Sequence, residues 1–162
     1  MVAFIFILVA LVTGCSEERF RNGGSSAMFP TIQSNEVILA DLAAYRDSGP
    51  QRWDVVVFGP PASISLPEQV WVMRVIGLPG ETLEIREDGV YVDGKRQAEP
   101  DRVTGIRYRP NIPTAPQPAV SYPYKISADS YFLVGDNTAN SFDSRFWGAL
   151  PGQNITGRVK DK

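Results

Sequence analysis

The chain has 162 residues, which suits one domain or one domain with a sizeable insertion. Its 16 Lys and Arg against 18 Asp and Glu give a net charge of −2, so we expect no nucleic-acid partner. It has no histidine and only one cysteine, Cys15, which excludes Ser-His and Cys-His catalysis, an internal disulfide and a multi-cysteine metal cluster. Any hydrolytic base must therefore be Lys, Asp, Glu or Tyr, and we expect no cofactor and no metal.

The first segment is an uninterrupted apolar run, residues 2–12, followed by Thr-Gly-Cys. A helix that crosses a bilayer needs about 20 apolar residues, so this run is too short and fits the central part of a secretory signal. Residues 12–15 also resemble a bacterial lipobox, in which the cysteine is lipidated and becomes the mature N-terminus. We expect residues 1–15 to be a lipoprotein signal with Cys15 lipidated or, alternatively, a short membrane anchor. Either reading places the rest of the chain at the extracytoplasmic face of a bacterial membrane.

Residues 16–22 are predicted to be a short charged linker, and residues 23–162 the folded domain. Within that domain, short apolar runs alternate with turn residues, which indicates strands rather than helices. The predicted strands are residues 37–40, 55–58, 70–76, 82–85, 90–92, 131–134 and 155–159. Arg86 to Gly89 is a hairpin signal between two of them. Many short strands joined by Gly and Pro turns favour an all-β barrel or sandwich.

Regularity is lost between residues 95 and 119, where five prolines occur. A core strand cannot contain that many prolines, so we expect a long surface excursion, and residues 95–125 become a variable accessory insertion. The last strands are separated by a polar segment that begins Gly-Asp-Asn. Asp136 and Asn137 are expected to satisfy the backbone groups of that turn.

Four segments, in order, resemble boxes of the type I signal (leader) peptidase family. Residues 25–32, Ser-Ser-Ala-Met-Phe-Pro-Thr-Ile, resemble its Ser-x-Ser-Met-x-Pro-Thr-Leu nucleophile box. Residues 54–58 and 73–81 are similar to its Asp-Val-Val-Val-Phe and Lys-Arg-Val-Ile-Gly-Leu-Pro-Gly-Asp boxes, and residues 135–148 match its last box almost throughout. The resemblance covers residues 25–159. It implies the family's fold of coiled antiparallel β-sheets and its activity, removal of signal peptides from exported preproteins by a Ser-Lys dyad.

The same resemblance places the nucleophile at Ala27 and the general base at Met73. A serine is activated only by an adjacent base, and a lysine serves as that base only when burial keeps it neutral. Neither alanine nor methionine can perform these roles. Alternation sets Met73 on the strand face opposite Arg74, where it is a good apolar replacement for a lysine stem. Two substitutions that each preserve shape indicate a retained scaffold without chemistry, and they fit natural divergence and deliberate inactivation alike.

The resemblance implies supporting roles for further residues. The Ser25 hydroxyl and the Ala27 N–H correspond to the oxyanion hole, and we expect that N–H to be available. Ser141 corresponds to a serine that orients the lysine. Asp143 and Arg145 correspond to residues that hold the last box together, which is also what a purely structural ion pair would do.

Three functions remain open at this stage. The first is a non-catalytic family member that binds extended, signal-peptide-like segments of exported proteins at a sheet edge near the membrane. The second is an active serine endopeptidase with a displaced dyad, Ser26 with Lys95 or Lys125, although a one-residue shift on an extended segment turns the side chain to the opposite face. The third is a structural lipoprotein that helps to assemble exported subunits.

Overall fold

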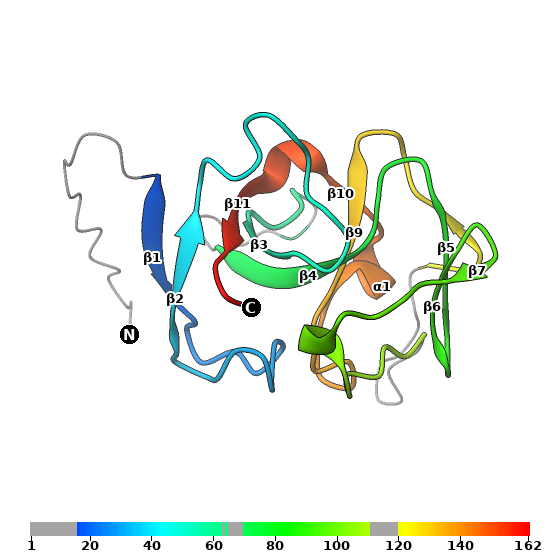
Figure 1. The fold of residues 1–162 in the computed structure, drawn as a ribbon, viewed down its shortest axis with the longest axis horizontal. Helices are drawn as coiled ribbons and strands as arrows, with labels where there is room; N and C mark the ends of the chain where they lie inside the picture. Colours follow the sequence, from blue (N-terminus) through cyan, green and yellow to red (C-terminus); the bar gives the residue numbers. More distant parts are fainter. Residues whose placement is uncertain (1–15, 63, 65–69, 111–119) are drawn as a thin grey trace.

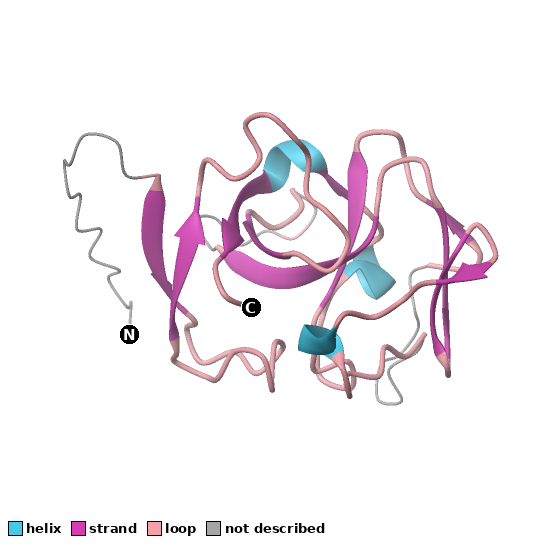
Figure 2. Cartoon of the chain, viewed as in Figure 1, coloured by secondary structure: helices cyan, strands magenta, loops and turns pink. Residues whose placement is uncertain are grey.

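The structure is a computed structural model that describes residues 16–62, 64, 70–110 and 120–162. The predicted signal or anchor, with Cys15, lies outside the described residues. The chain forms two antiparallel β-sheets with little helix, which confirms the all-β prediction (Figures 1 and 2). Among the described residues no helix has the length and apolar character needed to cross a bilayer.

The larger sheet has seven strands and the smaller has four. The order in the larger sheet is β1 (Glu17–Arg21), β2 (Val37–Asp41), β11 (Ile155–Val159), β3 (Val55–Phe58), β4 (Trp71–Gly77), β9 (Ser130–Val134) and β10 (Leu150–Pro151). The order in the smaller sheet is β7 (Lys95–Arg96), β6 (Gly89–Val92), β5 (Thr82–Arg86) and β8 (Tyr124–Lys125). Three short helical segments are η1 (Asp101–Val103), α1 (Ser144–Trp147) and η2 (Gly152–Asn154). Every predicted strand is present, with bounds that differ by a residue or two.

The linker predicted at residues 16–22 is wrong, because residues 17–21 form the edge strand β1 and pair with β2 along their whole length. Only Phe20 of this strand packs against the core, and its neighbours are charged and exposed. An ion pair between Glu17 and Lys160 ties the strand to the chain end. The sequence pattern missed the strand because backbone pairing, rather than an apolar face, holds it in place.

The sheets enclose two apolar cores that meet at β4 and β9. Met73 and Val75 of β4 belong to the first core, which lies within the larger sheet, whereas Ile76 of the same strand belongs to the second. The second core packs the smaller sheet against residues from the proline-rich region, among them Val103 and Tyr108. The expected surface excursion is therefore wrong in this respect, because the described part of the segment supplies fully buried side chains.

Candidate active site

Two buried side chains of the loop of residues 25–32 hold it against the first core. Met28 and Ile32 are 3% and 1% exposed and pack in the first core, and the Ile32 N–H donates to the Met28 carbonyl at 2.9 Å. The side-chain amide of Asn22 donates to the Ser25 carbonyl at 2.8 Å and fixes the start of the loop. The loop thus holds Ala27 at the surface in a defined position.

A second segment, residues 135–143, grips the same loop. The Asn137 N–H donates to the Ala27 carbonyl at 2.9 Å, and the Asn137 side-chain amide donates to the Ser26 carbonyl at 3.1 Å. Asn140 donates from its side-chain amide to Ser26 Oγ at 2.9 Å. The Asn137 side chain therefore satisfies the backbone of another loop rather than of its own turn, and its contacts fix the Ala27 peptide from both sides.

Ala27 and Ser141 lie against Gly135. The pairing of β4 with β9 sets Arg74 opposite Val134, and the same register continued by one position would set Met73 opposite Gly135. Paired residues of antiparallel strands project to the same face. A Cβ at Gly135 would lie only 2.5 Å from the Ala27 carbonyl oxygen and would collide with Ser141 Oγ. Only glycine allows the loop, the strand and Ser141 to approach this closely.

Ser141 carries an unpaired hydroxyl in this crowded place. The residue is 5% exposed, and its Oγ has no hydrogen-bond partner among the described residues. A buried hydroxyl without a partner loses its solvation without compensation, so native structures contain few of them. Met73, 3% exposed on the neighbouring strand, offers no nitrogen or oxygen to pair with it.

The two groups of the implied oxyanion hole contact each other. The Ala27 N–H donates to Ser25 Oγ at 3.2 Å, so the expectation that this N–H is available is wrong for this structure. Ser25 is exposed, and its hydroxyl is free to rotate. An acceptor oxygen placed at this point can replace the Ser25 oxygen on the Ala27 N–H and also receive the Ser25 hydroxyl proton.

Asp136 forms a buried hub rather than the turn contact expected from the sequence. Its carboxylate accepts Arg74 Nε at 2.9 Å and Nη2 at 2.6 Å, and both side chains are fully buried. Tyr108 donates its hydroxyl to the same carboxylate at 2.9 Å. The Thr31 hydroxyl also donates to this carboxylate. Burial and the Asp136 charge raise the pKa of Tyr108 above its ordinary value, so this phenol remains a donor. The hub links the loop, β4 and the proline-rich region.

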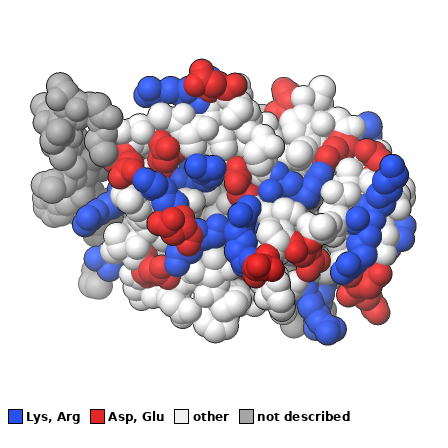
Figure 3. All heavy atoms as spheres, in the orientation of Figure 1, with Lys and Arg blue, Asp and Glu red and all other residues white. Residues whose placement is uncertain are grey.

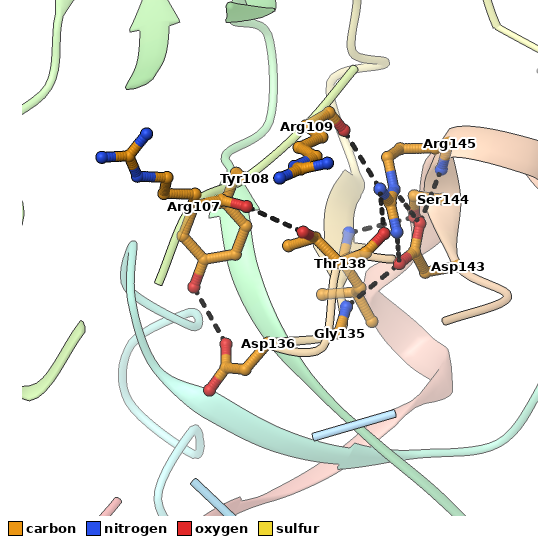
Figure 4. Close-up of polar contacts among 10 residues, drawn as sticks. Arg107, Tyr108, Arg109, Gly135, Asp136, Thr138, Asp143, Ser144 and Arg145 are labelled. Carbon is orange, nitrogen blue, oxygen red and sulfur yellow. Dashed lines mark hydrogen bonds and ion pairs between the residues drawn. The ribbon is translucent and has the colours of Figure 1, made fainter. Parts of the chain in front are cut away.

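Asp143 and Arg145 lie together in a second buried pair. Arg145 donates Nε and Nη2 to the two carboxylate oxygens of Asp143 at 2.8 and 2.7 Å. Asp143 also accepts the Gly135 N–H at 3.1 Å, and Arg145 Nη1 donates to the carbonyls of Thr138 at 2.8 Å and Arg109 at 3.0 Å (Figure 4). The pair therefore fixes the backbone before and after Asn137, the residue that holds the Ala27 carbonyl.

Neither lysine of the proposed displaced dyad contacts this loop. All four are described and none is buried: Lys95, Lys125, Lys160 and Lys162. The edge strand that carries Lys95, β7, lies at the right of Figure 1, whereas the loop after β1 lies at the lower left. Lys125 donates to the Gly80 carbonyl, and Ser26 Oγ accepts from Asn140. Ser26 is therefore not brought together with either lysine proposed for a displaced dyad.

Comparison with known proteins places these features in a family. The family model described as "Signal peptidase, peptidase S26" matches residues 1–161. The chain is 34% identical over 162 residues to a probable signal peptidase I-2 of Synechocystis sp., covering 98% of this chain and 68% of that protein. It is 34% identical over 139 residues to a signal peptidase I of Leptolyngbya laminosa, covering 83% of this chain and 63% of that protein.

A solved structure agrees with the sequence relatives. The crystal structure of a signal peptidase I from Enterococcus faecalis V583 aligns with a TM-score of 0.51 and 28% sequence identity, covering 68% of this chain and 97% of that chain. The chain spans about two thirds of the length of the two sequence relatives named above. By its sequence, its sheets and its family match, the chain belongs to the signal peptidase family, peptidase S26.

Proposed function

We propose that the chain is a non-catalytic signal peptidase that binds extended, signal-peptide-like segments of exported proteins without cleaving them. The observation that carries this proposal is the pair Ala27 and Met73, which the family resemblance aligns with the nucleophile and the base. A methyl group has no lone pair with which to attack a carbonyl, and a thioether sulfur does not accept a proton at neutral pH. The proposal also rests on the contacts of the side chains and backbone groups around the loop of residues 25–32.

Among the described residues, the acidic side chain that contacts the loop is already engaged by other groups. The chain has no histidine, and its four lysines lie at the surface. Asp136 is the carboxylate that contacts the loop, through Thr31. It is paired with Arg74 and also accepts from Tyr108. The Asp136 carboxylate is thus already occupied by buried donors, which supports binding rather than hydrolysis.

The unpaired hydroxyl of Ser141 supports the assignment of position 73 to the family's lysine. A lysine at position 73 would project to the face where Ser141 Oγ lies, beside Gly135 and the Ala27 carbonyl. Its amine would supply the hydrogen-bond partner that Ser141 Oγ lacks among the described residues. With methionine there, the cavity remains packed but the hydroxyl does not pair.

Backbone donors around Ala27 support the binding of an extended peptide. The N–H groups of Ser25 and Ser26 have no acceptor within the described part of the chain, and the Ala27 N–H holds only an exposed hydroxyl. Extended peptides commonly bind by pairing their backbone with such exposed donors. Signal-peptide-like segments are the class that the family resemblance implies.

Blocking the loop is expected to weaken peptide binding. Ala27→Trp places a large side chain over the backbone donors and should lower the photocrosslinking yield with a signal-peptide-like peptide by about tenfold, equivalent to ~1.4 kcal/mol. Ser48→Trp, at an exposed position outside this loop, is the matched control and should crosslink as the unmodified chain does. Equal yields from the two tryptophan variants would favour a purely structural lipoprotein instead.

We also propose that the domain is held at the extracytoplasmic membrane face by a lipid on Cys15 or by the short apolar segment before it. The apolar run and the lipobox-like residues 12–15 support this placement. Mass spectrometry of the mature chain from membranes is expected to find a diacylglyceryl-modified Cys15 at its N-terminus. A membrane-bound chain that retains residues 2–12 supports the segment as the anchor, and recovery of the whole protein in the aqueous fraction contradicts both.

A further inference from the structure

A cleft of about 310 Å³ adjoins the loop of residues 25–32. Phe29 and Pro30 of the loop line it together with residues 105–107, Arg109 and residues 136–139. Asn137 lines the cleft and also donates to the carbonyls of Ser26 and Ala27. The cleft is therefore separated by a single residue from the backbone that we propose to bind peptide.

Two arginines, Arg107 and Arg109, line this cleft with free guanidinium groups. Both side chains are exposed, and neither guanidinium has a hydrogen bond or an ion pair among the described residues. In Figure 4 the dashed lines from these residues start at their carbonyl oxygens, which accept Thr138 Oγ1 at 2.7 Å and Arg145 Nη1 at 3.0 Å. The backbone of each arginine is thus fixed while its charge is left uncompensated.

The charge of the cleft is positive although the chain as a whole is at −2. Among the described residues that line it, Asp136 is the only acidic one, and the buried pair with Arg74 neutralises it. Residues 110–123 contain no Asp or Glu, so the segment that follows the arginines adds no carboxylate. Basic and acidic groups are interspersed on the face drawn in Figure 3, and Arg86, for example, pairs with Glu84. The lining of this cleft thus combines two exposed arginines with a carboxylate that is already paired.

The spacing of the arginines matches an extended peptide. Ile106 and Tyr108 are buried and alternate with the exposed Arg107 and Arg109, so the two guanidinium groups leave the same side of the segment. Side chains on one face of an extended chain recur every second residue, about 6.6 to 6.8 Å apart. Two carboxylates at alternate positions of a bound peptide can therefore each meet one arginine, in the bidentate geometry that guanidinium groups favour.

We propose that this cleft selects peptides with acidic side chains at two alternate positions beside the segment held at Ala27. The inference rests on the proposed peptide binding and adds a specificity to it. The continuity of the cleft with the loop, through Asn137, favours a peptide over a lipid headgroup as the source of the anion. Phe29, half exposed at the edge of the cleft, supplies apolar contact for the aliphatic part of a Glu side chain.

The test is fluorescence anisotropy with the full chain and three labelled peptides. Each peptide has an apolar Leu/Ala half followed by a Ser/Ala half, and the second half carries two Glu, two Gln or two Lys at alternate positions. Two exposed ion pairs contribute about 0.2–1 kcal/mol each, so the Glu peptide should bind about 2- to 30-fold more tightly than the Gln peptide. Arg107→Gln with Arg109→Gln should remove this preference, and the double Lys variant should retain part of it. Arg102→Gln, an exposed arginine outside the cleft lining, is the matched control.

The outcomes separate this inference from the proposed function. Equal binding of the Glu and Gln peptides, or a preference that survives the double Gln variant, overturns the acidic specificity and leaves peptide binding intact. Failure of all three peptides to bind overturns both. Loss of binding to vesicles of anionic phospholipid in the double Gln variant, with no Glu preference among the peptides, assigns the arginines to a membrane surface and also overturns the inference.

Discussion

The double variant Ala27→Ser with Met73→Lys is expected to cleave a secretory precursor that the unmodified chain leaves intact. The serine would stand on a loop that Asn137 already fixes, and the lysine would replace a side chain that is 3% exposed. Burial at this site should lower the pKa of the new lysine toward the range of a general base. Loss of a nucleophile or base typically removes about 10⁴ to 10⁶ in rate, so the gain on restoring both should exceed 10³-fold.

Single variants provide the controls for this gain. Ala27→Ser alone has no base and Met73→Lys alone has no nucleophile, so each should remain inactive. Cleavage by the double variant should increase with pH, because the amine must be neutral. The pKa of a lysine in the unfolded chain is about 10.4, and burial lowers it in the folded variant. Between these two pKa values the unfolded state binds more protons than the folded state. The free energy of unfolding of the variant should therefore also rise with pH in this range. A folded double variant without cleavage would contradict a retained scaffold.

Asp136→Asn is expected to lower the free energy of unfolding by about 3–5 kcal/mol, because it leaves the fully buried Arg74 guanidinium without its counter-charge. The amide also gives Tyr108 and Thr31 a weaker acceptor than the carboxylate. Urea denaturation followed by tryptophan fluorescence measures the change. The tryptophan Trp53 lies beside this hub, since its carbonyl accepts Arg74 Nη1 at 2.8 Å.

An exposed ion pair is the control for this loss. Glu84→Gln breaks a contact with Arg86 in which both side chains reach solvent, and it should change stability by less than about 1 kcal/mol. If Asp136→Asn lowered the free energy of unfolding by as little as Glu84→Gln does, the hub would not hold the loop and the proline-rich region together. Circular dichroism at low denaturant would confirm that both variants remain folded before the comparison is made.

The sequence predicts strands well where apolar, β-branched residues cluster. Residues 55–58 are fully buried on both faces and read as a strand without ambiguity. Strand β1 has one apolar side chain, Phe20, so its pairing with β2 leaves no pattern to detect. In the described part of the proline-rich region, the sequence does not reveal that Tyr108 is buried against a partner 28 positions away.

At the candidate site, the sequence likewise assigns positions but does not reveal contacts between distant residues. The boxes assign positions for Ala27 and Met73, because a family resemblance transfers residue by residue along the chain. They do not reveal that the Asp136 carboxylate joins Thr31 and Arg74, since those residues lie 105 and 62 positions away. The unpaired hydroxyl of Ser141 is also a property of packing that no spacing predicts.

The loss of both dyad positions is tested most directly by incubating the purified, unmodified chain with a secretory precursor in detergent and measuring the precursor mass over time. The Ala27→Ser, Met73→Lys variant runs beside it, and the expected result is a precursor of unchanged mass in the presence of the unmodified chain. Release of a correctly cut signal peptide by that chain, abolished by Ser26→Ala, would contradict the proposal and establish a displaced nucleophile.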